Sequence, residues 1–152
     1  MVRFLWRFLL ISAVGLAVGG CSGEGAGRVT GSVTLNDRPL ADAEVQLLPQ
    51  KDRSLGAARG KTDSNGKFEI LVGGKTGQKL KPGKYVVLVT KYVDKKGQPL
   101  SAEESANQQA GGNVRNLVPE RYSEPDTSEQ YAEIKPGTND LPPFKLSSKA
   151  MR

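Results

Sequence analysis

Cys21 carries the most reactive side chain of the sequence, because it is the one cysteine among 152 residues. Cysteine reacts as its thiolate, which is a strong nucleophile and a metal ligand. A single cysteine excludes an intramolecular disulfide. Arg3 and Arg7 precede an uncharged, mostly apolar run over residues 8–18, and Val18-Gly19-Gly20 comes directly before the cysteine. This order is typical of a secretory signal, and the run is shorter than the ~20 residues of a membrane-spanning helix.

Val18-Gly19-Gly20-Cys21 resembles the lipobox of bacterial lipoproteins. The resemblance implies cleavage ahead of Cys21, transfer of a diacylglyceryl group to its sulfur and acylation of the new amino terminus. Two or more buried acyl chains hold a protein firmly on a membrane, at ~0.8 kcal/mol per methylene. Ser22, and not an aspartate, follows the cysteine. By resemblance to the sorting rule of Gram-negative bacteria, this favours the outer membrane over the inner one. The alternative interpretation is an ordinary secretory signal with a cysteine nearby by chance.

The sequence divides into three parts. We expect residues 1–20 to be a lipoprotein signal peptide, residues 21–27 to be the lipidated cysteine and a flexible glycine-rich tether, and residues 28–148 to form one domain. The net charge is +6, and removal of Arg3 and Arg7 leaves +4. This excess is scattered along the sequence, so we expect no nucleic-acid partner. Attraction to an anionic lipid surface or envelope polymer is a weaker alternative.

Residues suited to catalysis or metal binding are scarce. The sequence has no histidine, which removes the commonest general base and metal ligand. Asp63-x-Asn65-Gly66 begins like a calcium loop, but Gly74 stands at the twelfth position, where such a loop needs a glutamate. A tight hairpin turn accounts for the motif. The pair Glu103 and Glu104 is interpreted as part of a solvated helix face. We therefore predict no enzyme activity, no cofactor and no metal site.

Tyr92 and Tyr122 are the aromatic residues best placed to contact a ligand. They flank residues 92–120, the longest stretch without strand character, and long loops on a rigid scaffold often carry function. Their rings form a candidate ligand platform. Ser101 and Glu104 have the spacing of a capping box, which predicts a short helix over residues 101–109.

Short strands separated by turns must position these residues. Alternating apolar residues and turn signals predict an all-β fold, a seven-stranded antiparallel Ig-like or prealbumin-like sandwich. Residues 55–62 are low in apolar content, which indicates an edge strand, whereas residues 84–91 are apolar on both faces, which indicates a central one. The expected strands cover residues 28–35, 43–49, 55–62, 67–72, 84–91, 130–134 and 141–146.

Four fragments resemble a known family. Residues 29–45 are similar to the opening pattern GxVxxxGxPLxxAxV of carboxypeptidase regulatory-like domains, residues 62–68 to their T-D-x-x-G-x-F hairpin, and residues 82–87 to their PGxYxV strand. Residues 118–137 resemble the ending of small lipoproteins abundant in planctomycete-type bacteria. The resemblance implies a transthyretin-like sandwich with an accessory, binding or spacer role, and a structural role for Tyr122.

The expected function is a non-enzymatic module of the cell envelope. It would be attached to a membrane through lipid on Cys21, and would contact an envelope protein or polysaccharide. The alternative is a carbohydrate-binding module that uses the surface near Tyr92 and Tyr122. A small hydrolase is a third hypothesis, for which the sequence offers no activated nucleophile.

Overall fold

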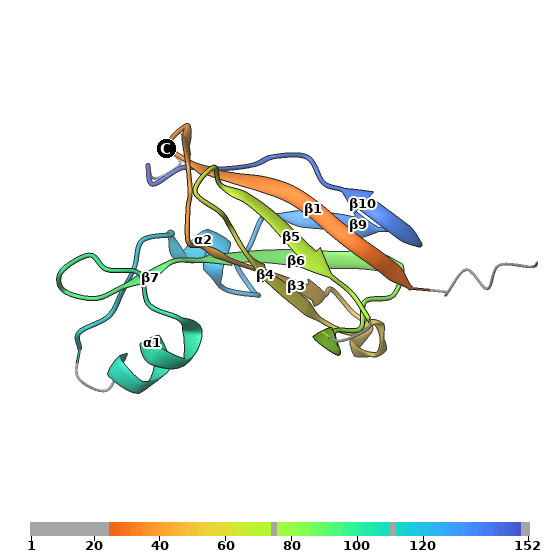
Figure 1. Cartoon of the computed structure of the whole chain (residues 1–152), viewed down its shortest axis with the longest axis horizontal. Helices are drawn as coiled ribbons and strands as arrows, with labels where there is room; N and C mark the ends of the chain where they lie inside the picture. The colour runs from red at the N-terminus through yellow and green to blue at the C-terminus, as the bar shows by residue number, and fades with distance from the viewer. Residues whose placement is uncertain (1–24, 74–75, 110–111, 150–152) are drawn as a thin grey trace, which may run out of the picture.

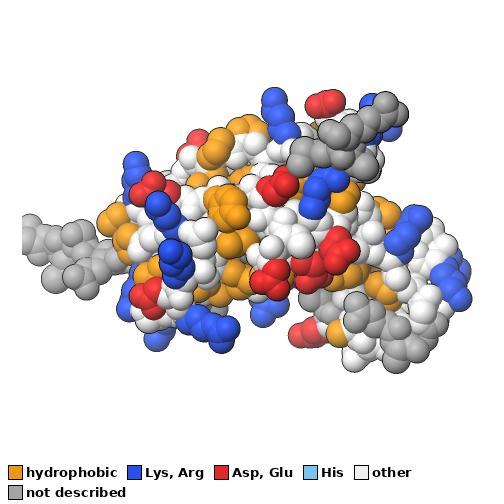
Figure 2. All heavy atoms as spheres, turned by 180° about the vertical axis from the view of Figure 1, so that it is seen from behind, with side chains coloured by type: hydrophobic (Ala, Val, Ile, Leu, Met, Phe, Trp, Pro, Cys, Tyr) orange, Lys and Arg blue, Asp and Glu red, His pale blue; other side chains and the backbone are white. Residues whose placement is uncertain are grey.

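The computed structural model describes residues 25–73, 76–109 and 112–149. The expected signal peptide over residues 1–20, the lipobox Val18-Gly19-Gly20 and Cys21 lie outside the described residues. Two β-sheets lie face to face, and a long insert with a helix extends from one end of the sandwich (Figure 1). Seen from behind, apolar side chains alternate with charged ones over the surface (Figure 2).

The first sheet is built around one long strand. The strand β1 pairs antiparallel with β5 through the register Thr30↔Glu69, and it runs parallel to β10 and β11. Alternation along β1 places Val29 and Val33 in the core, with no exposed surface on either. The strands are β1 (Ala26–Leu35), β2 (Arg38–Pro39), β5 (Lys67–Leu71), β10 (Gly137–Asp140) and β11 (Phe144–Leu146).

The second sheet is antiparallel throughout, in the order β4-β3-β6-β9. The central position of β6 and the edge position of β4 confirm the two expectations drawn from apolar content. The edge strand is shorter than expected, because β4 begins only at Ala58 and Leu55 is the last residue of a short 3-10 helix, η1 (Arg53–Leu55). The strands are β3 (Glu44–Pro49), β4 (Ala58–Lys61), β6 (Gly83–Thr90) and β9 (Tyr131–Ile134).

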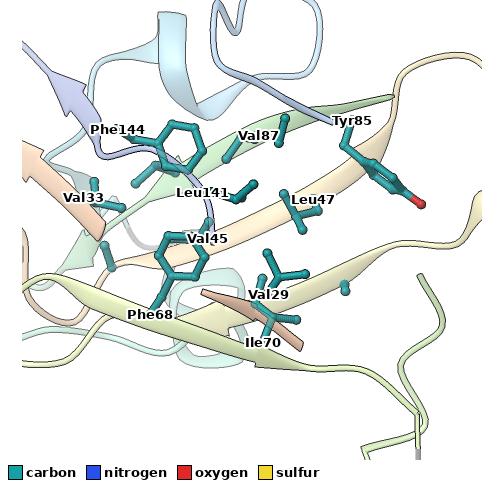
Figure 3. Packing of buried hydrophobic residues seen from close by; sticks show 14 of the residues in the cluster. Val29, Val33, Val45, Leu47, Phe68, Ile70, Tyr85, Val87, Leu141 and Phe144 are labelled. Carbon is teal, nitrogen blue, oxygen red and sulfur yellow. The ribbon is translucent and has the colours of Figure 1, made fainter. Parts of the chain in front are cut away.

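The core lies between the two sheets (Figure 3). Phe68 and Phe144 stack with ring centroids 6.3 Å apart, within the range of favourable aromatic pairs. A Cβ at Gly31 would lie 2.6 Å from Cζ of Phe68, so the glycine makes room for this ring. Tyr85 is fully buried, and its hydroxyl lies 2.7 Å from the carbonyl of Lys81. The sandwich is therefore filled by side chains from both sheets.

The sandwich differs from the expected one in its strand pairing. Eleven strand segments are present in the described residues, and the first sheet is mixed because β1 runs parallel to β10 and β11. Turn signals identify antiparallel neighbours, but the two ends of the chain pair without a turn between them. The strand expected over residues 141–146 is shortened to 144–146. Pro142 and Pro143 have no N–H to donate, and they separate β10 from β11.

The insert between β6 and β9 contains the expected helix. The helix α1 starts one residue after Ser101, whose backbone N–H donates to Glu104 Oε2 at 2.8 Å, while the Glu104 N–H donates to Ser101 Oγ at 3.2 Å. This reciprocal pair confirms the predicted capping box. The other elements are the strands β7 (Tyr92–Val93) and β8 (Arg115–Asn116) and the helices α1 (Ala102–Gln109) and α2 (Glu120–Ser123).

Candidate functional site

The base of the insert is fixed to the second sheet. The side chain of Asn116 accepts hydrogen bonds from the N–H groups of Lys91, at 3.0 Å, and Val118, at 3.1 Å. The Lys91 ammonium donates to the carbonyl of Ala41 at 2.7 Å. The N–H of Leu117 donates to the carbonyl of Lys91 at 2.9 Å. Lys91 thus joins the end of β6, the insert and the β2–β3 turn, which holds the base of the insert against the sandwich.

A cleft of about 260 Å³ lies between the insert and the outer face of the second sheet. The sheet supplies charged and hydroxyl side chains, whereas the insert supplies an aromatic ring and a leucine. The lining residues are Asp42, Glu44, Arg59, Gly60, Lys61, Thr90, Tyr92, Leu100 and Ser101.

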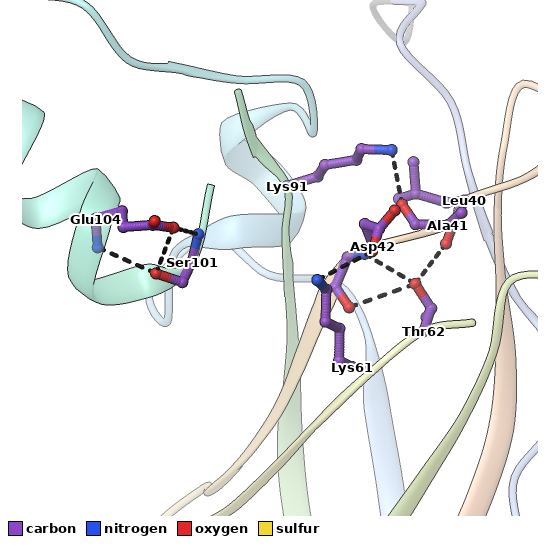
Figure 4. A network of polar contacts seen from close by, with 9 residues as sticks. Leu40, Ala41, Asp42, Lys61, Thr62, Lys91, Ser101 and Glu104 are labelled. Carbon is purple, nitrogen blue, oxygen red and sulfur yellow. Dashed lines mark hydrogen bonds and ion pairs between the residues drawn. The ribbon is translucent and has the colours of Figure 1, made fainter. Parts of the chain in front are cut away.

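The charges in this cleft balance each other. Lys61 Nζ lies 2.9 Å from Asp42 Oδ1, and Arg59 Nη1 lies 3.7 Å from Glu44 Oε1. Figure 4 shows the first of these pairs on the sandwich, and the hydrogen-bonded Ser101 on the insert. Because each carboxylate is matched by a base, the cleft has no net charge from these four groups. It offers both donors and acceptors to a neutral polar ligand.

Tyr92 also lines a second cleft, which adjoins the first. The second cleft has a volume of about 440 Å³, and it shares Glu44, Arg59, Thr90 and Tyr92 with the first. Burial raises the pKa of the Tyr92 phenol, and the negative charges of Glu124 and Glu44 raise it further. The hydroxyl therefore stays protonated and able to donate a hydrogen bond near neutral pH.

The structure separates the two tyrosines of the predicted platform. Tyr92 is partly exposed in the cleft, but Tyr122 is 6% exposed and belongs to the core. The Tyr122 ring packs under the Arg121 guanidinium, 4.7 Å from its centroid, and its hydroxyl accepts from the Ser147 N–H at 3.4 Å. The prediction of a two-ring platform is therefore wrong for Tyr122, because a buried ring cannot stack on a ligand. Tyr122 instead packs within the core of the sandwich.

Sequence reasoning missed the most exposed aromatic side chain among the described residues. Tyr131, on β9, is 57% exposed and lines a shallow depression with Gln50 and Lys84. The alternation of β9 was a usable signal, because Ala132 and Ile134 point into the core and leave Tyr131 outward. A larger depression of about 720 Å³ covers the outer face of the first sheet, but Phe68, its one aromatic residue, is buried.

In residues 25–73, 76–109 and 112–149, no group of three or more Asp, Glu, His or Cys side chains is close enough to hold a metal ion. Within the same ranges, no helix is both long and apolar enough to span a bilayer.

Comparisons with known proteins give no family assignment. No family model matches the chain, and no curated protein matches it in sequence. Among solved structures, a 9R-lipoxygenase from Cyanothece PCC8801 aligns with a TM-score of 0.38 and 16% identity, over 89% of this chain and 18% of the lipoxygenase. The chain thus spans less than a fifth of that protein's length, and a likeness this weak carries no conclusion about fold or activity.

Proposed function

We propose that the protein is a non-enzymatic, lipid-anchored module of the cell envelope, on the outer membrane, that presents a β-sandwich for interaction or structural support. The observation that carries the proposal is the sequence Val18-Gly19-Gly20-Cys21, which ends four residues before the described sandwich begins at Gly25. Lipid on the cysteine is a firm anchor when two or more acyl chains are attached. The envelope partner is a protein or a polysaccharide.

The position of the tether supports this proposal. Four residues span at most about 14 Å, so a lipidated Cys21 would keep Gly25 close to the membrane. Gly25 precedes β1 at one end of the sandwich, whereas α1 and β7 lie at the opposite end (Figure 1). In this arrangement the insert and its clefts face away from the membrane, where a soluble or polymeric partner can reach them.

We assign the sandwich to the carboxypeptidase regulatory-like, prealbumin-like type, on the four sequence patterns named above. Asp37 stands where the opening pattern has its second glycine, and its φ of 62° is one that glycine adopts freely. The β1–β2 turn therefore keeps the backbone that the pattern requires, although the residue differs.

The anchor is tested by mass spectrometry of the full chain expressed in a bacterial host. We expect a membrane-bound species that starts at Cys21 and carries diacylglyceryl mass, and we expect Cys21→Ser to abolish both the modification and membrane retention. Ser22→Ala is the matched control, since it changes the neighbouring side chain and leaves the thiol. A mature chain that is unmodified and recovered in the soluble fraction would contradict the proposal.

A specific observation favours carbohydrate binding as a second candidate function. The cleft of about 260 Å³ beside Tyr92 combines an aromatic ring with charge-balanced donors and acceptors, and the second cleft adds the carboxylate of Glu124. This lining suits a ligand that has an apolar face and many hydroxyl groups. A sugar ring has this chemistry. Because the clefts are contiguous, a chain of sugars fits them better than a single ring.

Binding of neutral oligosaccharides, followed by isothermal titration calorimetry, tests this second function. Tyr92→Ala should weaken binding about tenfold, and Arg59→Gln, at an exposed position, should weaken it without affecting folding. Tyr131→Ala is the matched control, because it removes an exposed tyrosine outside both clefts. Binding that persists in Tyr92→Ala, or that is lost equally in Tyr131→Ala, would exclude the clefts as the sugar site.

A further inference from the structure

Three loops of the sandwich meet at the start of β1. The N–H of Ala26 donates to the carbonyl of Leu80 at 3.0 Å, and the N–H of Gly137 donates to the carbonyl of Gly25 at 3.2 Å. The backbone N–H of Lys81 in turn donates to the carbonyl of Leu55 at 2.8 Å. The β3–β4, β5–β6 and β9–β10 loops therefore form one end of the molecule. We call this surface the tether end, and it comprises residues 50–57, 72–73, 76–83 and 135–137.

The tether end is strongly basic. It includes five basic side chains, all exposed, and one acidic side chain, Asp52. Asp52 caps η1 by accepting from the Ser54 N–H at 2.9 Å. Hydrogen bonding by Ser54, first by its side chain and then by its backbone, lowers the pKa of Asp52, with a smaller effect from the charge of Lys81. None of the three ion pairs among the described residues involves a base of this surface. The five bases are Lys51, Arg53, Lys79, Lys81 and Lys135.

Charge on the rest of the molecule is nearly balanced. The described residues contain 18 basic and 15 acidic side chains, so 13 basic and 14 acidic ones lie outside the tether end. The positive excess of the described domain is thus confined to one end. Figure 2 shows several Lys and Arg side chains, with a few Asp and Glu among them, at its left end, which is the end at which β1 begins in Figure 1. Bases that look scattered along the sequence are gathered by the three loops.

An exposed apolar side chain lies close to this surface. Leu71, the last residue of β5, is 49% exposed and pairs in register with Arg28 near the start of β1. The next residue, Val72, donates to the carbonyl of Gly27 at 3.1 Å, which holds this part of the chain beside the tether. Basic residues beside an exposed leucine are typical of surfaces that rest at a membrane interface.

We propose that the tether end rests on anionic phospholipid headgroups of the membrane that holds the lipid on Cys21, an inference that rests on the proposed lipid anchor. Lys and Arg near an anionic bilayer are attracted to it, and the attraction falls off within a Debye length. The short tether keeps the five bases close to that surface. This contact orients the domain, with the insert directed away from the bilayer.

The test uses the full chain, purified from bacterial membranes in detergent and reconstituted into nanodiscs. One set contains phosphatidylcholine, and the other contains about 30% phosphatidylglycerol, an anionic lipid. Intact mass and co-elution with the discs report the anchor, and the acetylation rate of each lysine reports its access to solvent. We expect Lys79 and Lys81 to react about fivefold more slowly on anionic discs than on neutral ones. The protection should disappear at about 1 M salt, where the Debye length is ~3 Å.

Lys95 and Lys96 provide the matched control within the same molecule. Both are exposed, and both lie in the insert, at the opposite end from the tether. Each of these two lysines should be acetylated at the same rate on neutral discs as on anionic ones. Lys51 and Lys135 should also react more slowly on anionic discs than on neutral ones. The double variant Lys79→Gln/Lys81→Gln should raise their reaction rates on anionic discs, whereas Lys95→Gln/Lys96→Gln should leave those rates unchanged.

Two failures are distinguishable in this design. An unmodified chain that does not co-elute with the discs would refute the lipid anchor. A lipidated chain that stays with the discs would refute the electrostatic contact if Lys79 and Lys81 react at the same rate on both lipid compositions. Equal protection of Lys95 and Lys96 would refute the proposed orientation.

Discussion

Thr62 is a buried residue on which the geometry of the cleft depends. It follows β4, is 3% exposed, and its hydroxyl donates to the carbonyl of Leu40 at 2.6 Å and accepts from the N–H of Ala43 at 2.8 Å. Its carbonyl also accepts from the N–H of Asp42 at 3.1 Å. Asp42 has a φ of 55° and lines the cleft, where it pairs with Lys61. We therefore expect loss of the Thr62 hydroxyl to destabilise both the β2–β3 turn and one wall of the cleft.

The loss of stability in Thr62→Val can be worked out from the backbone groups that lose their hydrogen-bond partner. Valine keeps the volume and β-branching of threonine, but the N–H of Ala43, a residue with no exposed surface, loses its partner. A buried donor left without a partner costs about 1–3 kcal/mol, and the carbonyl of Leu40 loses a donor too. We expect the free energy of unfolding to fall by about 2–3 kcal/mol. In a domain of this size that lowers the midpoint of thermal unfolding by about 10 °C.

Thermal unfolding of the full chain, followed by circular dichroism, measures this loss. Thr62→Ser is the control, because it keeps the hydroxyl and removes one methyl group, at a cost of about 1 kcal/mol. Hydrogen exchange at the Ala43 amide should accelerate in Thr62→Val and stay nearly unchanged in Thr62→Ser. If the two variants lose equal stability, the hydroxyl contributes nothing, and the assignment of the turn to Thr62 is refuted.

Other substitutions test individual contacts of the sandwich and of the insert. Asn139→Ala should destabilise the chain by about 2 kcal/mol in urea unfolding, because the buried amide makes two 2.8 Å hydrogen bonds to the backbone of Lys135. The control is Thr138→Ala, at the exposed neighbouring position, which should be nearly silent. Gly60→Ala should also destabilise the chain, since the new Cβ would lie 2.8 Å from Cγ1 of Ile70 and 2.9 Å from the carbonyl oxygen of Glu69. A midpoint of thermal unfolding equal to that of the wild type would contradict this prediction. Hydrogen bonds from Ser101, first from its backbone and then from its side chain, lower the pKa of Glu104 in the folded chain. The cap that Glu104 forms with Ser101 is therefore complete above pH ~4.5, and it is lost as the pH falls through the lowered pKa of the folded state. Amide exchange in α1 should rise over that acid range, and Glu104→Gln should remove the pH dependence.

Local features of the fold are readable from the sequence because their causes are local. Alternating apolar residues located most strands, including the central β6, since side chains in a strand point to opposite faces. The spacing of Ser101 and Glu104 predicted the start of α1, because both partners of the cap lie within one turn. Turn signals, however, predicted antiparallel pairing throughout, and this is wrong for β1 with β10 and β11.

Features that join distant segments were decided by the tertiary structure alone. Tyr122 is buried in the core and accepts a hydrogen bond from Ser147, 25 positions further along the chain, and the cleft at Tyr92 is formed by strands of the second sheet together with the insert. The basic tether end depends on three loops that are separated in sequence and gathered by the sheets. In the sequence the charges of these loops look evenly scattered, because a linear pattern carries no information about which turns share an end of the sandwich. Spacing thus determined the elements and the cysteine motif, whereas pairing between distant strands determined which side chains meet.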